Sequence, residues 1–92
     1  MLFEYDPRKS DANHVKHGIG FAEARALWDD MDRIELAARS ETESRYAVIG
    51  NIAGVMWTVI CTNRGETVRI ISARRSRKEE AALYEREKNT IR

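Results

Sequence analysis

Hydrophobic and polar positions follow two different periods along the chain, and the period changes near residue 30. Residues 2–5 begin with an apolar–polar alternation that predicts a short strand. A later stretch instead has apolar residues at helical spacing, at Phe21, Ala24, Leu27 and Trp28. It predicts a helix that starts at Gly20 or Phe21, ends at Leu27 or Trp28, and packs this stripe into the core.

Between these two segments, residues 7–17 are expected to form another helix because both of their ends carry capping signals. Asp6 is suited to accept backbone N–H bonds as the N-cap, and Pro7 loses no needed donor at the first helical position. Gly18 follows His17 and suits the left-handed conformation of a C-cap. Three residues of this helix are expected to form a polar cluster on one face: Asn13, Lys16 and His17.

Beyond residue 30, alternating and continuous apolar runs indicate strands. The predicted strands are 33–37, 45–52, 55–62 and 67–73. Ala53-Gly54 is short enough for a two-residue hairpin turn, and residues 63–66 form the next turn. Tight turns join only antiparallel neighbours, so the last three strands form an antiparallel meander. Trp57 lies in the run that is expected to be buried on both faces, and we expect its side chain to be well buried.

The C-terminal segment contains a capping-box pattern. Ser76 is followed three residues later by Glu79, which predicts a third helix over residues 77–88. The resulting fold class is α+β, an antiparallel β-sheet with two N-terminal helices and one C-terminal helix. The two early helices must cover one face of the sheet because their apolar stripes need a partner. The opposite face then remains open and is free to bind.

The chain length of 92 residues predicts a single domain spanning residues 1–92. The formal net charge is only +1, but acidic residues concentrate between residues 23 and 43. The segment 64–78 is basic, with Glu66 opposed by Arg64, Arg69, Arg74, Arg75, Arg77 and Lys78. Such a dipolar distribution suits the binding of a phosphate backbone, and it is equally typical of a solvated arginine-rich face.

The cysteine content and the hydrophobicity pattern indicate where in the cell the protein is expected to be. Cys61 is the single cysteine, so no intramolecular disulfide forms, and its apolar neighbours indicate a small buried hydrophobe. The sequence has no apolar run of about 18 residues and no charged-then-apolar pattern at its N-terminus. We therefore expect a cytoplasmic protein with no membrane association.

Several motifs together resemble the BrnT toxin family, over residues 3–84. In the N-terminal half these are Phe3-Glu4-Tyr5-Asp6-Pro7-Arg8-Lys9, Asn13, Lys16-His17-Gly18-Ile19, Phe21 and Ala24. In the C-terminal half they are Glu43-x-Arg45, Gly50, Thr62-x-Arg64, Arg69-x-Ile71-Ser72-Ala73-Arg74, Glu79 and Tyr84. The most specific feature is Lys-His-Gly after an Asp-Pro helix, combined with Arg-x-Ile-Ser-Ala-Arg near the C-terminus.

This resemblance implies a RelE-like fold and the function of a type II toxin, an endoribonuclease that cleaves RNA and arrests growth. It also implies a BrnA-type antitoxin partner that neutralises the toxin in a hetero-oligomer. The ribbon–helix–helix region of that antitoxin binds operator DNA, so the chain itself reaches DNA only through its partner.

Metal-free RNA cleavage needs a base for the 2′-hydroxyl, cations for the charge on the phosphoryl oxygens, and an acid for the departing 5′-oxygen. His17 suits the base or the acid, and Glu43 is a second candidate base. Arg64, Arg69 and Arg74 suit charge stabilisation. Tyr84 suits the orientation of a group or the stacking of a base. The predicted catalytic set consists of His17, Glu43, Arg64, Arg69 and Tyr84.

The predicted RNA-binding residues are Lys9, Lys16, Arg45, Arg74 and Arg75. Strand alternation also assigns faces to the last strand. It places Arg69 with Ile71 and Ala73 on one face, and Val68, Ile70 and Ser72 on the other. The second set is the better core face, so Arg69 is expected to point to the open side.

Each candidate also has a structural interpretation. A protonated His17 complements the dipole at its helix end, Glu43 and Arg45 suit an ion pair, and Tyr84 suits an anchor for the last helix. His14 lies three residues before His17, but no cysteine or carboxylate completes a metal-ligand set, so no metal or other cofactor is expected. The alternative function is a non-catalytic RNA-binding or regulatory module that uses the same basic face.

Overall fold

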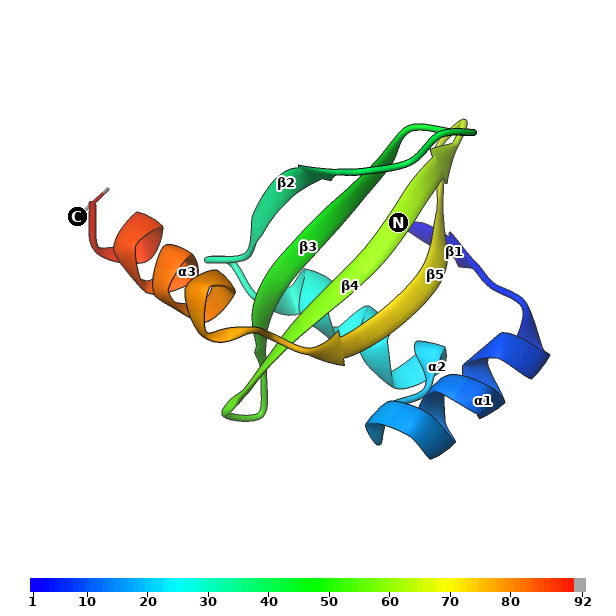
Figure 1. Ribbon diagram of the computed structural model, residues 1–92, viewed down its shortest axis with the longest axis horizontal. Helices are drawn as coiled ribbons and strands as arrows, with labels where there is room; N and C mark the ends of the chain where they lie inside the picture. Colours follow the sequence, from blue (N-terminus) through cyan, green and yellow to red (C-terminus); the bar gives the residue numbers. More distant parts are fainter. Residues whose placement is uncertain (91–92) are drawn as a thin grey trace.

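The computed structural model describes residues 1–90 and has an α+β architecture, with a five-stranded mixed sheet and three helices (Figure 1). A 3₁₀ turn, η1, continues the second helix. In chain order the elements are β1 (Leu2–Glu4), α1 (Pro7–His17), α2 (Phe21–Ala24), η1 (Arg25–Asp29), β2 (Ile34–Ala38), β3 (Arg45–Ile52), β4 (Val55–Arg64), β5 (Thr67–Arg75) and α3 (Lys78–Thr90). Within residues 1–90, no helix is long and apolar enough to cross a membrane.

Helix α1 begins and ends at the predicted residues. The Asp6 carboxylate accepts the backbone N–H of Arg8 at 2.9 Å, and Gly18 adopts a left-handed φ of 80° at the C-cap. The second predicted helix is only one α-helical turn long, because the chain tightens into 3₁₀ geometry at Arg25. Its apolar stripe is nevertheless buried as expected, with Phe21 and Leu27 at most 1% exposed.

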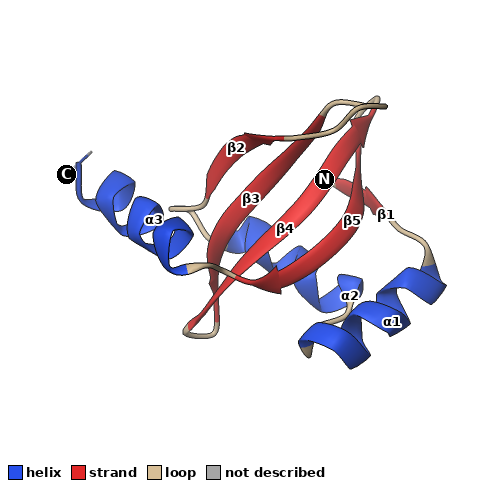
Figure 2. Ribbon diagram, in the orientation of Figure 1, coloured by secondary structure: helices blue, strands red, loops and turns tan. Residues whose placement is uncertain are grey.

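The sheet order is β1-β5-β4-β3-β2, which makes β4 the central strand (Figure 2). Strands β2 to β5 form an antiparallel meander, and the predicted turn between β3 and β4 has positive φ at both Ala53 (51°) and Gly54 (88°). The expectation of a wholly antiparallel sheet is wrong at one edge, where β1 pairs parallel with β5. Most of the chain separates these two strands, so no tight turn dictates their relative direction.

A β-bulge in β5 changes which residues share a face. Ile60 pairs with Ser72 and Cys61 pairs with Ile70, so Ile71 is the extra residue. Beyond the bulge, Ala73 joins the core side and Ser72 lies on the side of Arg69. The predicted grouping of Arg69 with Ala73 is therefore wrong, although Arg69 itself lies on the expected side, opposite the core.

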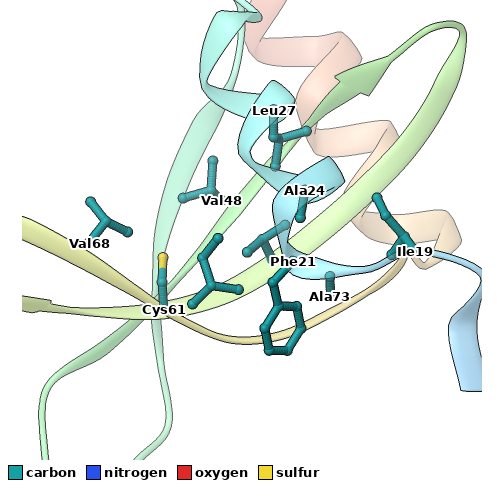
Figure 3. Packing of buried hydrophobic residues seen from close by; sticks show 10 residues of the cluster. Ile19, Phe21, Ala24, Leu27, Val48, Cys61, Val68 and Ala73 are labelled. Atoms are coloured by element: carbon teal, nitrogen blue, oxygen red, sulfur yellow. The ribbon is translucent and has the colours of Figure 1, made fainter. Parts of the chain in front are cut away.

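The main core lies between the sheet and the layer formed by α1, α2 and η1 (Figure 3). Its buried members come from α2, η1, the loop between α1 and α2, and the sheet: Ile19, Phe21, Ala24, Leu27, Val48, Val59, Cys61, Val68, Ile70 and Ala73. The expected burial of Cys61 is confirmed. Trp57 is only partly buried, contrary to expectation, because it lies near the start of β4 with the guanidinium of Arg75 above its ring.

Helix α3 packs against β3 with Tyr84 as its one fully buried side chain. On β3 and β4, Ile49 and Thr58 form a directly paired, fully buried couple that is outside the main core cluster. The Ser76–Glu79 capping box does not form. Glu80, one residue later, accepts the backbone N–H of Arg77 at 2.7 Å instead, while Ser76 bonds to the Thr58 hydroxyl.

Candidate functional site

Three arginines gather at the end of the sheet where the β2–β3 loop and the β4–β5 turn lie. Arg45 begins β3, Arg64 ends β4 and Arg69 lies on β5. Thr62 pairs with Arg69 and is buried, and its hydroxyl donates to the Ser44 carbonyl at 2.6 Å. We call the surface formed by Arg45, Arg64 and Arg69 the basic end of the sheet. Figure 1 shows that the helices lie away from this end of β4 and β5.

Arg64 is the most accessible of these cations. It is exposed and pairs through its backbone with Thr67, at the start of β5. Among residues 1–90, its guanidinium has no hydrogen-bond or ion-pair partner. Five N–H donors of fixed geometry are therefore available to an external anion.

Arg69 contacts the carboxylate of Glu4, an interaction that the sequence analysis did not anticipate. The Arg69 Nη1 to Glu4 Oε2 distance is 2.7 Å, and the two residues also face each other in the β1–β5 register. The side chains are 28% and 37% exposed. Partly exposed ion pairs contribute about 0–1 kcal/mol, so an external anion is able to compete for this guanidinium.

Arg45 and Glu43 form the ion pair that the sequence analysis gave as the structural interpretation. Glu43 Oε1 accepts from both Nε and Nη2 of Arg45 at 3.2 Å. Next to this pair is a pocket of about 390 Å³, lined by Ala37, Glu43, Ser44, Arg45, Tyr46, Thr62 and Asn63. The pocket gives the basic end of the sheet a recess beside the exposed guanidinium groups.

Arg74 and Arg75 do not belong to the basic end of the sheet. Arg74 donates two hydrogen bonds to the carboxylate of Glu80, at 2.7 and 2.9 Å. These bonds lower the pKa of Glu80 to about 2, against the opposing effect of burial, with help from the Arg77 N–H and the Thr58 hydroxyl. Arg75 lies over the Trp57 ring, 5.8 Å from its centroid. The Arg74 guanidinium thus serves the fold, whereas Arg75 is exposed.

The α1 candidates lie on a separate element beside β5. Lys9 and Lys16 are exposed, and His17 is partly buried at the helix end. Asn13 does not join them in the predicted polar cluster. Its side chain is buried, donates to the carbonyls of Ile19 and Ala73, and accepts the Ala73 N–H at 3.3 Å. Asn13 thereby fixes α1 to the part of β5 that β1 does not reach.

Tyr84 is placed in the interior and its hydroxyl is engaged. It is 3% exposed and donates to Asp30 Oδ2 at 2.7 Å. Burial and the neighbouring carboxylate both raise the pKa of Tyr84 above its usual value. The same Asp30 oxygen accepts the Asn51 N–H at 2.8 Å. Burial opposes ionisation of Asp30, but the hydrogen bonds from Asn51, Tyr84 and Asp32 outweigh it and lower the pKa of this carboxyl. This geometry matches the anchoring interpretation of Tyr84.

The structure thus brings together four predicted residues (Glu43, Arg45, Arg64 and Arg69) and leaves the others on α1, on α3 or at the far end of β5. Glu4 contacts Arg69 at this end of the sheet, and the sequence pattern did not predict this contact. The apolar–polar alternation of residues 2–5 placed it on a strand, but nothing in that pattern indicated which strand pairs with it. Residues 1–90 contain no group of three or more histidine, cysteine or carboxylate side chains arranged to hold a metal ion.

One exposed and two partly exposed guanidinium groups at an uncovered sheet end, above a small α+β core, define a protein suited to bind a polyanion. A sequence profile described as "Ribonuclease toxin, BrnT, of type II toxin-antitoxin system" matches residues 5–80. The chain belongs to this family of type II toxin–antitoxin toxins, whose members have an antitoxin partner. A search of curated protein sequences found no match.

Proposed function

We propose that this toxin is an endoribonuclease that cleaves RNA at the basic end of the sheet without a metal ion. The observation that carries the proposal is the unpartnered guanidinium of Arg64 next to the half-exposed guanidinium of Arg69. Ideal strand geometry places their Cα atoms about 8 Å apart, because they are on adjacent strands and offset by two residues. Both side chains are long enough to meet at one phosphate.

In the proposed reaction, the RNA 2′-hydroxyl attacks its own phosphorus and the 5′-oxygen departs. Arg64 and Arg69 stabilise the negative charge that builds on the phosphoryl oxygens. Arg45 holds a neighbouring phosphate beside the 390 Å³ pocket. Glu43 adjoins Arg45 and remains a candidate base. Tyr84 is left out of this chemistry because its hydroxyl is buried and bonded to Asp30.

The α1 residues play a supporting part in this proposal. Lys9 and Lys16 are exposed cations on the helix beside β5, where they extend the positive surface toward a longer RNA strand. His17 lies at the end of the same helix and stays a candidate acid or base. Arg74 is excluded from RNA contact because Glu80 already occupies its guanidinium. Arg75 is exposed and its contact with the Trp57 ring leaves its N–H donors free, so it stays a candidate RNA contact.

We further propose that the antitoxin is of the BrnA type, with a ribbon–helix–helix region that binds operator DNA. The fold is proposed to be RelE-like. The support for both proposals is family membership and the α+β architecture. The antitoxin inhibits by covering the basic end of the sheet, so the toxin contacts DNA only within the hetero-oligomer.

The proposal is tested with toxin separated from its antitoxin complex and incubated with end-labelled RNA in the presence of EDTA. We expect cleavage products that end in a 2′,3′-cyclic phosphate and a 5′-hydroxyl. Arg64→Ala and Arg69→Ala are expected to reduce the cleavage rate by about 100-fold, because each removes a group that stabilises charge in the transition state. The same variants should relieve growth arrest in cells while the fold remains intact.

Arg25→Ala is the matched control, since Arg25 is an exposed arginine of η1, on the helix layer behind the sheet. It should cleave RNA at the wild-type rate. Binding of RNA without any cleavage by the wild-type protein would refute the enzymatic proposal. That outcome would favour the alternative, a non-catalytic RNA-binding or regulatory module.

A further inference from the structure

Among residues 1–90, Glu4 is the one carboxylate that contacts an arginine of the basic end from a neighbouring strand. It lies on β1, outside the segment 5–80 that the family profile matches. Its Oε2 accepts from Arg69 Nη1 at 2.7 Å. The side chain is 37% exposed, and the pair lies on the face of the sheet opposite the main core, because the neighbouring Val68 and Ile70 belong to that core.

The β1–β5 register fixes where this carboxylate lies. Glu4 pairs with Arg69, which in turn pairs with Thr62 on β4, so the three residues form one row across adjacent strands. Arg64 is offset by two residues from Thr62 on β4. A phosphate that reaches both Arg64 and Arg69 therefore also lies near the Glu4 carboxylate, which contacts the Arg69 guanidinium directly.

We propose that Glu4 is the general base that removes the proton from the attacking 2′-hydroxyl, an inference that rests on the ribonuclease function proposed above. The bond from Arg69 to Oε2 orients the carboxylate, and Oε1 has no partner among residues 1–90. An oxygen held at the site but left free to accept a hydrogen bond is what proton abstraction requires. Arg69 then has two functions, because it orients the base and stabilises the phosphate charge.

Glu43 is the competing carboxylate, and its position is less suited to the reaction. It lies in the loop before β3, and its Oε1 accepts both bonds from Arg45, the first residue of β3. Thr62 and the β4 backbone separate the Glu43–Arg45 pair from Arg69. Glu4 in contrast contacts Arg69 on β5, the strand that pairs directly with Arg64.

The proposed step transfers one proton to Glu4 and exchanges one oxygen bond at phosphorus for another. The Glu4 carboxylate takes the proton of the 2′-hydroxyl while the 2′-oxygen forms a bond to phosphorus. The bond from phosphorus to the 5′-oxygen breaks, and that oxygen takes a proton from solvent water. The products are a 2′,3′-cyclic phosphate and a 5′-hydroxyl. Glu4 returns its proton to the solvent, and no oxidant or metal takes part.

The first experiment compares wild type with Glu4→Gln in single-turnover cleavage at saturating RNA. Loss of a general base is expected to lower the rate by about 100-fold or more. Affinity is measured separately with an RNA that carries a 2′-deoxyribose at the scissile position and is therefore not cleaved. This affinity should change by no more than about threefold, because glutamine keeps the shape of the side chain and affects phosphate contacts little.

Glu66→Gln is the matched control, because it removes the same charge from an exposed residue of the β4–β5 turn nearby. It should cleave at the wild-type rate. Glu4→Asp keeps the charge and shortens the reach by one methylene, so it should also be slow although it is folded. Faster cleavage and tighter binding by Glu4→Gln would overturn the proposal and show that Glu4 merely masks Arg69.

Chemical rescue distinguishes a base from a structural partner of Arg69. Glu4→Ala is assayed with added formate and with added acetate, either of which can occupy the vacated space. A base role predicts partial recovery of the rate, with acetate faster than formate at equal concentration because acetate is the stronger base. Equal rescue by both anions would show that only the charge next to Arg69 matters and would overturn the assignment.

Failure of this inference is separable from failure of the proposed function. If the wild-type protein cleaves RNA and Glu4→Gln cleaves equally fast, Glu4 is not the base and the ribonuclease proposal stands. If the wild-type protein does not cleave RNA at all, both proposals are wrong.

Discussion

The Glu80 carboxylate accepts hydrogen bonds from both Nη atoms of Arg74, at 2.7 and 2.9 Å, and thereby joins the first turn of α3 to the end of β5. The same carboxylate accepts from the Thr58 hydroxyl at 3.1 Å and from the Arg77 N–H at 2.7 Å. One side chain therefore serves as helix cap, ion-pair partner and link to the central strand. Because the apolar stripe of α3 is narrow, polar contacts of this kind carry much of its attachment.

These contacts predict a specific loss of stability in acid. The folded-state pKa of Glu80 is about 2, below the usual value of 4.5, so its contribution is fully present above about pH 4.5 and is lost as the pH falls toward 2. Glu80→Gln should lower the free energy of unfolding at pH 7 by about 2–3 kcal/mol. Urea denaturation of both proteins between pH 7 and pH 2 measures this. The difference between them should shrink as the pH falls, and a constant difference would contradict the prediction.

Helix α3 is also attached through the hydrogen bond from the Tyr84 hydroxyl to Asp30. Loss of this bond should lower the stability of the protein less than loss of the Glu80 contacts does. Tyr84→Phe removes the 2.7 Å bond to Asp30 and keeps the buried ring, so it should cost about 1 kcal/mol of stability. Tyr5→Phe is the control, because the Tyr5 hydroxyl has no partner among residues 1–90. Thermal denaturation of the two variants should separate them. An RNA cleavage rate that falls more than stability explains would restore Tyr84 to the catalytic set.

Asn13 predicts a large effect from a single polar side chain. Asn13→Ala removes both bonds to the backbone of Ala73 and the bond to the Ile19 carbonyl, and leaves those buried groups unpaired. The expected cost is about 2–3 kcal/mol. Amide hydrogen exchange should accelerate at Ala73 in particular. Asp11→Ala, at an exposed position of the same helix, should stay within about 0.5 kcal/mol of wild type.

The β3–β4 turn predicts a stabilising substitution. Ala53 has a φ of 51°, a conformation that asparagine adopts more readily than alanine does. Ala53→Asn creates the Asn-Gly pair typical of a type I′ turn and should raise the free energy of unfolding by about 0.5–1 kcal/mol. Ala53→Val places a β-branched side chain at the same positive φ and should lower it. A stabilised valine variant would show that the turn has another conformation.

Local rules predicted the parts of the fold that depend on neighbouring residues. Asp6-Pro7 and Gly18 marked the ends of α1, and Ala53-Gly54 marked the hairpin, because caps and tight turns depend on a few adjacent dihedral angles. The alternating and continuous apolar runs likewise located β2, β3, β4 and β5. Here the residue types near each end determine the local structure, and tertiary contacts add little.

The predictions that were wrong share one physical cause. At these positions, contacts between residues far apart in the sequence determine the structure. The bulge at Ile71 contains no glycine to indicate it, and it inverts the faces of Ser72 and Ala73. Glu80 replaced Glu79 as the capping residue because Arg74 holds its carboxylate near the helix start. Trp57 is only partly buried, so Trp57→Ala should cost less than the 3–5 kcal/mol expected of a core tryptophan.

The candidate site was partly predictable for the same reason. Alternation along β5 placed Arg69 on the uncovered side, and the short turn placed Arg64 near it. No local pattern connected Glu4 with Arg69, because they are 65 residues apart in the chain. The sequence also gave equal weight to Arg74, whose guanidinium is in fact occupied by Glu80.

The parallel pairing of β1 with β5 has a consequence for biosynthesis. The first strand to leave the ribosome finds its partner only when the last strand has followed it. A nascent chain that ends before residue 67 lacks Arg69 and gives Glu4 no strand to pair with, so the basic end of the sheet is incomplete. The surface that combines Arg45, Arg64 and Arg69 therefore assembles only after β5 has been translated.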